Sequence, residues 1–431
     1  MTQRLATRDA DFAERFTTLV EARRDADADV AADVRAILAR VAADGDAAVA
    51  DLTRRFDGVD LDAAGWRIEA DECAAAYAGL EAGLRDALDL AAARIRAFHA
   101  AQLPEDRDTT DAAGVRLGAR WSAVEAAGIY VPGGRASYPS SVLMNALPAR
   151  VAGVGRLVMV TPTPGGAANP LVLAAAHIAG VDELWRIGGA QAIAALAYGT
   201  GRIAPVDTIT GPGNAWVAEA KRQLYGRVGI DMVAGPSEIV VVADCANDPD
   251  WIAADLLSQA EHDPTSQSIL FTDDADFAER VAGAVEKLLA RLDTGATAGA
   301  SWRDHGAIVV TRDLAEAMPL VDRLAPEHLE LAVADPEPLF AAVRHAGSVF
   351  LGRMTPEAIG DYIAGPNHVL PTGRRARFAS GLSVLDYMKR TSFIALGADG
   401  MAAIGPGAVA LAEAEGLPAH AESVRVRLGG R

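Results

Sequence analysis

Two side chains near the end of a predicted helix are spaced to bind one metal ion. Gln259 and His262 lie three residues apart on a helix that is expected to begin with Asp248 as N-cap and Pro249 in its first turn. A spacing of three places both side chains on one helix face, so both could reach the same ion. Gln is an uncommon ligand, and a His near a helix C-terminus also interacts with the helix dipole. The spacing alone therefore leaves both interpretations open.

A carboxylate and an imidazole stand side by side at Glu327 and His328, just before a predicted strand. At the edge of a loop both side chains can face one cleft. His suits the role of general base near neutral pH, and a Glu with a raised pKa can activate water. No HExxH helix accompanies the pair, which excludes a zincin motif. A solvent-facing pair at the start of a strand is the alternative.

Further carboxylates and imidazoles occur in two loops. Asp361 and His368 lie in a stretch rich in glycine and proline, and Glu415 and His420 flank Gly416-Leu417-Pro418. Together with the Gln and His of the helix they form a set of nitrogen and oxygen ligands. Such a set suits Zn, Mn or Co at a catalytic site with open positions.

The two cysteines offer a poor alternative for aldehyde oxidation through a thiohemiacetal. Asp244 and Asp248 stand close to Cys245 and would raise its pKa, which disfavours the reactive thiolate. Cys73 lies in an Ala-rich helical run and is expected to pack. Two distant cysteines also exclude a disulfide framework or a cysteine-based zinc site.

Two glycine-containing loops could approach a nucleotide. Gly188-Gly189-Ala190-Gln191 and Gly211-Pro212-Gly213-Asn214 each stand between a predicted strand and a predicted helix. Glycine lets the backbone approach a ligand, and a helix N-terminus offers free N–H groups. The chain has no GxGxxG fingerprint followed by an acidic residue. One such loop alone is an ordinary turn, but two in neighbouring units favour a nucleotide site.

These residues must be positioned by an α/β framework. Residues 26–100 are Ala-rich with helical spacing of apolar residues, and short Val/Ile/Leu runs alternate with helical stretches from about residue 120 onward. This alternation is typical of parallel sheets. The predicted strands are 156–160, 183–187 and 206–210 in a first series, then 238–242, 266–271, 307–311, 329–333 and 348–351 in a second.

Composition excludes several classes of protein. The 431 residues suffice for two or three domains, and 51% hydrophobic with 23% charged residues is ordinary for a globular protein. A net charge of -18 argues against a nucleic-acid surface, which needs clustered Lys and Arg. The start lacks the apolar region of a secretory signal, and no stretch is long enough to span a bilayer. We therefore expect a cytoplasmic protein without membrane or nucleic-acid partners.

Several long motifs resemble the histidinol dehydrogenase family, in the right order and from about residue 30 to the end. The matching stretches are YVPGG (130–134), GPGNAWVAEAKR (211–222), DMVAGPSE (231–238), SQAEHDPTSQ (258–267), APEHLEL (325–331), GDYIAGPNHVLPTG (360–373), SGLSVLDYMKR (380–390) and EGLPAHAESV (415–424).

The resemblance implies a zinc-dependent, four-electron oxidation of L-histidinol through L-histidinaldehyde to L-histidine with two NAD, the final steps of histidine biosynthesis. One Zn²⁺ per subunit is expected, with Mn²⁺ as a substitute. The implied metal ligands are Gln259, His262, Asp361 and His420, and the implied acid–base pair is Glu327 and His328. The implied substrate contacts are Ser237, Gln259, His262, His328, Asp361, His368, Glu415 and His420, and the implied NAD contacts are Tyr130, Gln191 and Asn214.

The resemblance also implies the architecture, namely two incomplete Rossmann-like parallel-sheet domains with helical N-terminal and C-terminal extensions. The expected division is an N-terminal arm (1–24), a first α/β domain (25–127 with 238–378), a second α/β domain (128–237) and a tail (379–431). In the family this tail reaches across a homodimer, so Glu415 and His420 are expected to complete the site of the other subunit.

Three residues depart from the pattern of relatives. Arg374 and Arg375 follow PTG where many relatives carry small residues, and Met354 stands where an aromatic is common. They lie near the Asp361–His368 loop but remove no expected ligand. The alternatives are a relative that oxidises another polar alcohol and a non-catalytic zinc-binding or nucleotide-binding protein. Retention of the complete ligand, acid–base and substrate set disfavours both.

Overall fold

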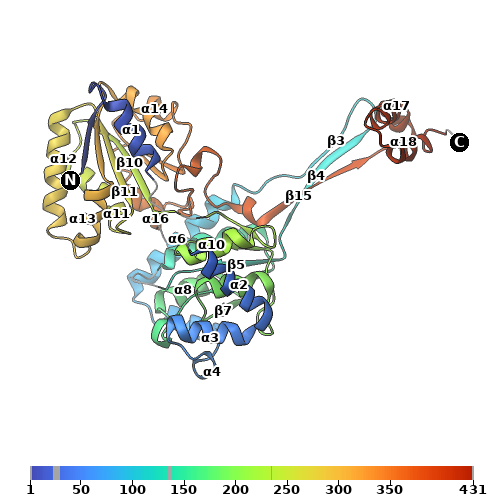
Figure 1. Cartoon of the computed structure of the whole chain (residues 1–431), viewed down its shortest axis with the longest axis horizontal. Coiled ribbons are helices and arrows are strands. Elements are labelled where there is room, and N and C mark those ends of the chain that lie inside the picture. The colour runs from blue at the N-terminus through green and yellow to red at the C-terminus, as the bar shows by residue number, and fades with distance from the viewer. Residues whose placement is uncertain (1, 23–29, 134–137, 234, 430–431) are drawn as a thin grey trace.

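The computed structural model describes residues 2–22, 30–133, 138–233 and 235–429. They form two α/β lobes and an arm that extends from them (Figure 1). Gly134 and Ala234 of two matching motifs, and the expected domain boundary at 24–25, lie outside the described residues. Among the described residues, no helix is both long and apolar enough to cross a bilayer.

Lobe 1 is built on a six-stranded parallel sheet with the order β1-β12-β11-β10-β13-β14. Its strands are β1 (Gln3–Ala6), β10 (Glu238–Ala243), β11 (Gln267–Thr272), β12 (Ala307–Val310), β13 (His328–Ala332) and β14 (Ser348–Leu351). Its helices are α1 (Phe12–Glu21), α11 (Pro249–Ala260), α12 (Ala275–Leu289), α13 (Gly295–His305), α14 (Leu314–Leu324), α15 (Glu337–Phe340) and α16 (Glu357–Tyr362).

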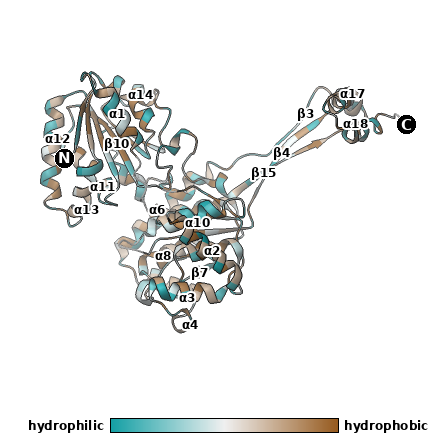
Figure 2. Cartoon of the chain, viewed as in Figure 1, coloured by the Kyte–Doolittle hydropathy of each residue, from teal (hydrophilic) through white to brown (hydrophobic). Residues whose placement is uncertain are grey.

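The central strands of lobe 1 are apolar because helices cover both faces of the sheet. Along β10, Ile239 and Val241 join a core with α11, α12 and α13, whereas Val240 and Val242 join a core with α1 and α14. This strand therefore forms a continuous apolar run, as Figure 2 also indicates for the interior of the lobe.

Lobe 2 contains a second six-stranded sheet with the order β2-β7-β6-β5-β8-β9, parallel except for β2. Its strands are β2 (Arg67–Ile68), β5 (Ala126–Tyr130), β6 (Arg156–Val160), β7 (Glu183–Trp185), β8 (Thr208–Thr210) and β9 (Gly229–Ile230). Its helices are α2 (Ala31–Asp44), α3 (Asp46–Asp57), α4 (Leu61–Ala64), α5 (Ala70–Ala78), α6 (Ala82–Ala100), α7 (Pro139–Ala152), α8 (Pro170–Ala179), α9 (Gly189–Tyr198) and α10 (Ala215–Leu224).

The packing of the N-terminal third differs from the expected division. Helices α2 and α3 share a core with α9 and α10 of lobe 2, although residues 25–127 were grouped with residues 238–378. Strand β1 pairs with β12, so the first residues belong to lobe 1. The apolar periodicity of a helix predicts a buried face but not the sheet that covers it, which explains the difference.

The arm is an antiparallel sheet of β3 (Arg107–Thr110), β4 (Arg116–Ala123) and β15 (Met388–Ala395), and it carries α17 (Ala398–Ala414) and α18 (Pro418–Arg425) far from the lobes (Figure 1). The expected break between helices at 416–418 is present. The arm's strands were not expected, because β15 is largely exposed and has no buried face to produce an alternating pattern. The expected fold class, α/β with parallel sheets and helical extensions, is confirmed.

Candidate active site

The candidate catalytic residues lie at the amino ends of β10 and β13, where lobe 1 meets lobe 2. Glu327 precedes β13 and His328 begins it, and both side chains are buried. The 363–373 loop comes from the same lobe and brings His368 to within 3.5 Å of Ser141 Oγ on α7 of lobe 2, measured from His368 Nε2. The site is therefore built from both lobes.

The hydrogen bonding of His328 defines its tautomer. Its Nδ1 lies 3.0 Å from the carbonyl oxygen of Glu238, which can only accept, so Nδ1 carries the proton. The other nitrogen, Nε2, has no hydrogen-bond partner among the described residues and carries the lone pair. Burial lowers the pKa of His328 to about 3, so the ring is neutral at physiological pH. A neutral imidazole with a free lone pair is the form a general base requires.

Two carboxylates of α16 face this nitrogen. His328 Nε2 lies 3.6 Å from Glu357 Oε1 and 3.8 Å from Asp361 Oδ1. The two acids are four residues apart and share a helix face. One ligand atom from each of the three residues lies within 4.8 Å of the others, a spacing that could hold a metal ion. Sequence reasoning missed Glu357, although its spacing to Asp361 was a signal that could have identified it.

Burial controls the ionisation of these carboxyl groups. It raises the pKa of Glu357 to about 8, with Asp361 adding to the effect, and it raises the pKa of Asp361 to about 6. Burial also raises the pKa of Glu327 well above its ordinary value. The backbone N–H of Glu238 donates to Glu327 Oε2 at 2.9 Å, which opposes this shift and fixes the carboxyl orientation. The site thus combines a neutral imidazole with carboxyl groups that can hold protons.

Three of the expected metal ligands, Gln259, His262 and Asp361, belong to lobe 1, whereas the fourth, His420, lies on the arm. Gln259 is only 2% exposed and its Oε1 has no hydrogen-bond partner among the described residues. His262 is exposed, yet its charge contributes to the lowered pKa of His328 and of His368, so it lies near both. The orphaned oxygen of Gln259, the imidazole of His262 and the carboxylate of Asp361 fit a divalent metal such as Zn²⁺.

The two tail residues lie on the arm. Glu415 follows α17 and His420 lies in α18, and both are exposed at the far end of the arm (Figure 1). Within one chain they do not join Gln259, His262 and Asp361 of lobe 1.

The other expected substrate contacts lie close to the acid–base pair. Ser237 directly precedes β10 and is partly buried, and its carbonyl oxygen accepts from the backbone N–H of Gln267 at 2.9 Å. His368 Nδ1 lies 3.0 Å from the carbonyl oxygen of Asp361, so this nitrogen also donates. Burial lowers the pKa of His368 to about 4, which keeps its ring neutral.

The three expected NAD contacts share the carboxyl edge of the lobe 2 sheet. Tyr130 ends β5, Gln191 lies in the first turn of α9 and Asn214 is the N-cap of α10. The backbone N–H of Gly189 donates to the Tyr130 hydroxyl at 3.2 Å, which connects two of these positions. In open α/β sheets ligands bind outside the carboxyl ends of the strands, so this arrangement suits a nucleotide.

A buried ion pair supports the loop after β8. Lys221 pairs with Asp231, and both side chains are almost completely buried. Lys221 Nζ donates to the Gly211 carbonyl at 3.0 Å and Asp231 Oδ2 accepts from the Gly211 N–H at 2.8 Å. Gly211 has a φ of 111°, and a Cβ there would lie 2.1 Å from the Tyr130 carbonyl oxygen. The loop conformation therefore requires glycine and is fixed by the pair.

The remaining residues singled out in the sequence lie outside this cluster. Cys245 is exposed after the carboxyl end of β10, whereas the acid–base pair lies at the amino end of the sheet. Met354 is 79% exposed. Arg374 adopts a φ of 63° and its Nε donates to the Arg323 carbonyl at 3.1 Å, while Arg375 Nη1 donates to the Thr372 carbonyl at 3.2 Å.

Comparisons with known proteins agree over nearly the whole chain. A family model described as histidinol dehydrogenase matches residues 20–428. Histidinol dehydrogenase of Zymomonas mobilis is 65% identical over 428 residues, covering 99% of this chain and 100% of that protein. The corresponding protein of Rhodospirillum rubrum is 64% identical and covers 99% of each. A crystal structure of histidinol dehydrogenase from Elizabethkingia anophelis superposes with a TM-score of 0.94 at 35% identity, covering 99% of this chain and 98% of that one.

Proposed function

The chain belongs to the histidinol dehydrogenase family of NAD-dependent oxidoreductases, and on this premise we propose that it oxidises L-histidinol through the aldehyde to L-histidine. The observation that carries the proposal is the neutral His328, whose free Nε2 faces the Glu357 and Asp361 carboxyl groups next to Glu327. A two-step oxidation of an alcohol requires a base, a carboxyl group that activates water, and residues that bind a metal ion. This buried site offers all three.

The metal, proposed to be Zn²⁺, would be held by Gln259, His262 and Asp361 of one chain and by His420 of the other. When bound, it supplies Lewis-acid polarisation and a fixed point for the substrate's imidazole and amine. The orphaned Gln259 oxygen supports its part in this set. We propose that Mn²⁺ can substitute for Zn²⁺ at this set of ligands.

His328 is proposed to take the hydroxyl proton of the alcohol at Nε2. Its Nδ1–H bond to the Glu238 carbonyl holds the ring in the required tautomer and orientation. Because burial keeps the ring neutral, the lone pair is available without prior deprotonation. Glu327 is proposed to activate the water that hydrates the aldehyde. Its Oε2 lies 3.7 Å from His328 Nδ1, so the two catalytic side chains are adjacent.

The nicotinamide cofactor, NAD, supplies the hydride acceptor for each of the two oxidations. Tyr130, Gln191 and Asn214 are proposed to contact it at the carboxyl edge of the lobe 2 sheet. This edge carries α7 and Ser141, which lies beside His368 of the 363–373 loop. The two lobes would therefore hold cofactor and substrate next to one another, which is a requirement of direct hydride transfer.

The remaining two residues are proposed to come from a second subunit. His420 and Glu415 lie at the end of the arm, remote from the lobes of their own chain (Figure 1). A homodimer in which each arm reaches the other subunit would deliver both residues to a site that already holds Ser237 and His368. Substrate and metal would then be bound by both subunits.

The test is the yield of NADH per L-histidinol consumed, measured with added zinc and with a chelator. We expect two NADH per substrate, and loss of activity on chelation. One NADH per substrate would contradict the role of Glu327 in water activation. No NADH from L-histidinol, with turnover of another polar alcohol, would refute the proposed substrate.

A further inference from the structure

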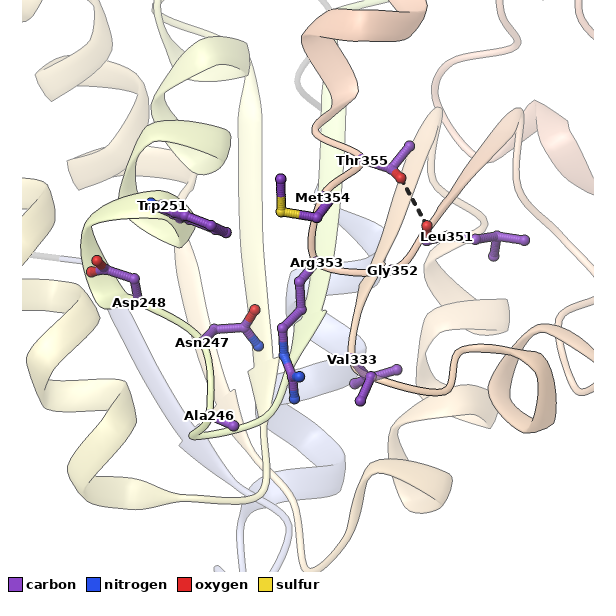
Figure 3. Close-up of a pocket in the computed structure, with 11 residues that line it drawn as sticks. Ala246, Asn247, Asp248, Trp251, Val333, Leu351, Gly352, Arg353, Met354 and Thr355 are labelled. Carbon is purple, nitrogen blue, oxygen red and sulfur yellow. Dashed lines mark hydrogen bonds between the residues drawn. The ribbon is translucent and has the colours of Figure 1, made fainter.

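A pocket lies at the carboxyl edge of the lobe 1 sheet, opposite the amino edge that carries the acid–base pair. Strand β10 is followed along the chain by β11 and β12 on one side, and by β13 and β14 on the other. The order of the strands therefore reverses between β10 and β13, and open α/β sheets bind ligands outside the carboxyl ends at such a point. A pocket of about 670 Å³ lies there, formed by the segments that follow β10, β13 and β14 (Figure 3).

The upper walls of this pocket carry exposed apolar side chains. Trp251 of α11 is 49% exposed and Met354 is 79% exposed, and both lie above the floor in Figure 3. Val333 and Leu351 also belong to the apolar lining. A half-exposed indole beside a thioether offers a planar ligand a surface for stacking. The volume is within the range of small-molecule sites.

The floor presents one oriented acceptor. Asn247 is 6% exposed, and its Nδ2 donates to the carbonyl oxygens of Ala332 at 2.6 Å and Asp244 at 3.1 Å, which fixes the orientation of the amide. Its Oδ1 has no hydrogen-bond partner among the described residues and points toward Trp251 and Met354 in Figure 3. A buried acceptor without a donor is unfavourable, so the site suits a ligand that supplies an N–H group.

The charges around the pocket disfavour phosphate and carboxylate. The cation that lines the pocket, Arg353, pairs with both oxygens of Asp244 at 2.8 and 2.6 Å and is neutralised. The loop after β10 contains no glycine, and the N-terminus of α11 is capped by Asp248, whose Oδ1 accepts from the Asp250 N–H at 2.9 Å. Pro249 offers no N–H group. An anion would therefore meet carboxylates where a nucleotide-binding loop offers amides.

We propose that this pocket binds an uncharged or cationic heteroaromatic ring that carries an N–H donor. The ring lies against Trp251 and Met354, and its N–H donates to Asn247 Oδ1. Imidazole-containing metabolites and nucleobases share this chemistry. The pocket lies at the carboxyl edge of the sheet, and the acid–base pair lies at the amino edge, so the two sites are separate.

Benzimidazole is the probe that tests this site on the full-length protein. Its binding is measured by calorimetry or ligand-observed NMR and compared with 1-methylbenzimidazole, which keeps the ring and the basic nitrogen but lacks the N–H. We expect the methylated probe to bind about tenfold more weakly, since it leaves Asn247 Oδ1 unpaired. Equal binding of the two probes would overturn the proposed hydrogen bond and with it the site.

A variant pair locates the bound probe. Trp251→Ala removes the stacking surface at a half-exposed helical position that tolerates Ala, and Phe340→Ala removes an exposed aromatic of the same lobe outside the pocket. We expect Trp251→Ala to weaken benzimidazole binding by about tenfold or more and Phe340→Ala to leave it unchanged. Equal binding by Trp251→Ala and the wild type would assign the probe to another site, such as the metal centre, and overturn the proposal. Adenosine and 4-methylimidazole, compared in the same assay, distinguish the nucleobase source from the imidazole source.

Discussion

At the scale of single residues, His328 is positioned to act as a base because one hydrogen bond and its burial fix its protonation state. The Glu238 carbonyl holds the proton on Nδ1, and burial prevents protonation of the ring. We expect His328→Ala to lower kcat by about 10²–10⁴, the usual contribution of a general base, while the metal content stays unchanged. Steady-state kinetics and metal analysis of the same preparation check both. Wild-type turnover in His328→Ala would refute the assigned role.

Glu357 was not among the site residues predicted from the sequence, and tertiary packing brings it to His328. Its Oε2 accepts from Ser258 Oγ at 3.2 Å, next to Gln259, while its other oxygen faces His328. A partner of this kind typically contributes about 10–100-fold to activity or metal affinity. We therefore expect Glu357→Gln to lower kcat/KM or metal affinity within that range. Glu337→Gln, at an exposed position, serves as the control. Equal kinetics and metal affinity of the two variants would contradict the proposed role of Glu357 in the site.

A buried pair of acids behind the site predicts a pH-dependent stability. Burial raises the pKa of Glu330 to about 9, with Asp255 adding to the effect, and so Glu330 holds a proton that it can share with Asp255. A raised folded-state pKa gives stability that is complete below the unfolded value and is lost as pH rises toward the folded value. For Glu330 this window runs from its ordinary value of 4.5 to about 9.

Glu330→Gln imitates the protonated acid and keeps a donor for Asp255. We expect thermal unfolding of the metal-free variant to match the wild type near the acid end of the window, and to occur at a higher temperature than the wild type near the alkaline end. Calorimetry across that pH range measures the difference. A difference that does not grow with pH would contradict the proposed protonation of Glu330.

At the scale of elements, most strands of the lobe 1 sheet and half of those of the lobe 2 sheet could be predicted, because their buried faces leave a clear apolar signal, whereas β1, β2, β5 and β9 were missed. The predicted strand at 156–160 coincides with β6, and the predicted strand at 266–271 differs from β11 by one residue at each end. The predicted strand at 183–187 extends two residues beyond β7. Arg186 and Ile187 are buried, which explains the apolar signal, but they do not belong to the strand. An apolar pattern in the sequence predicts which residues are buried, but it does not predict which of them pair in a sheet.

The apolar pattern of the sequence does not predict which distant segments pack against one another. Glu357 meets His328 because α16 folds back onto the amino end of β13, whereas the sequence indicates only that Glu357 shares a helix face with Asp361. Residues 379–387, assigned to the tail, begin within lobe 2: the Tyr387 hydroxyl hydrogen-bonds Thr210 Oγ1 at 2.8 Å and the Asn145 carbonyl at 2.9 Å. Such contacts depend on tertiary packing that local propensity does not determine.

The loop after β8 should depend on the ion pair beneath it. Lys221→Met leaves Asp231 as an uncompensated buried charge, and breaking such a pair costs about 3–5 kcal/mol. We expect a loss of this size in the free energy of unfolding by urea, with a raised KM for NAD because Asn214 follows the same loop. The double variant Lys221→Met with Asp231→Asn should recover part of the stability, and Lys287→Met, at an exposed position, should lose almost none. Wild-type stability of Lys221→Met would contradict this role of the pair.

At the scale of the whole molecule, the arm separates residues that the proposed chemistry needs together. Strands β4 and β15 pair over eight residues and carry the two terminal helices away from both lobes (Figure 1). Apolar side chains remain exposed along this arm, including Ile394 and Leu411. An extended element with exposed apolar residues is typical of a surface that is covered in an assembly. The proposed homodimer provides that cover and also brings His420 to a metal site.

Complementation between two inactive variants tests this exchange. In a mixed dimer of His328→Ala and His420→Ala subunits, one site would lack both residues, while the other would combine His328 of one subunit with His420 of its partner. Random pairing in co-expression makes half of the dimers mixed, so we expect about a quarter of the wild-type activity, although each variant alone is inactive. If His420 served its own chain instead, each site of the mixed dimer would lack one residue and no activity would return. Mixed dimers isolated from this mixture with two different affinity tags should therefore show about half of the wild-type activity if the arm crosses between subunits, and none if it folds back.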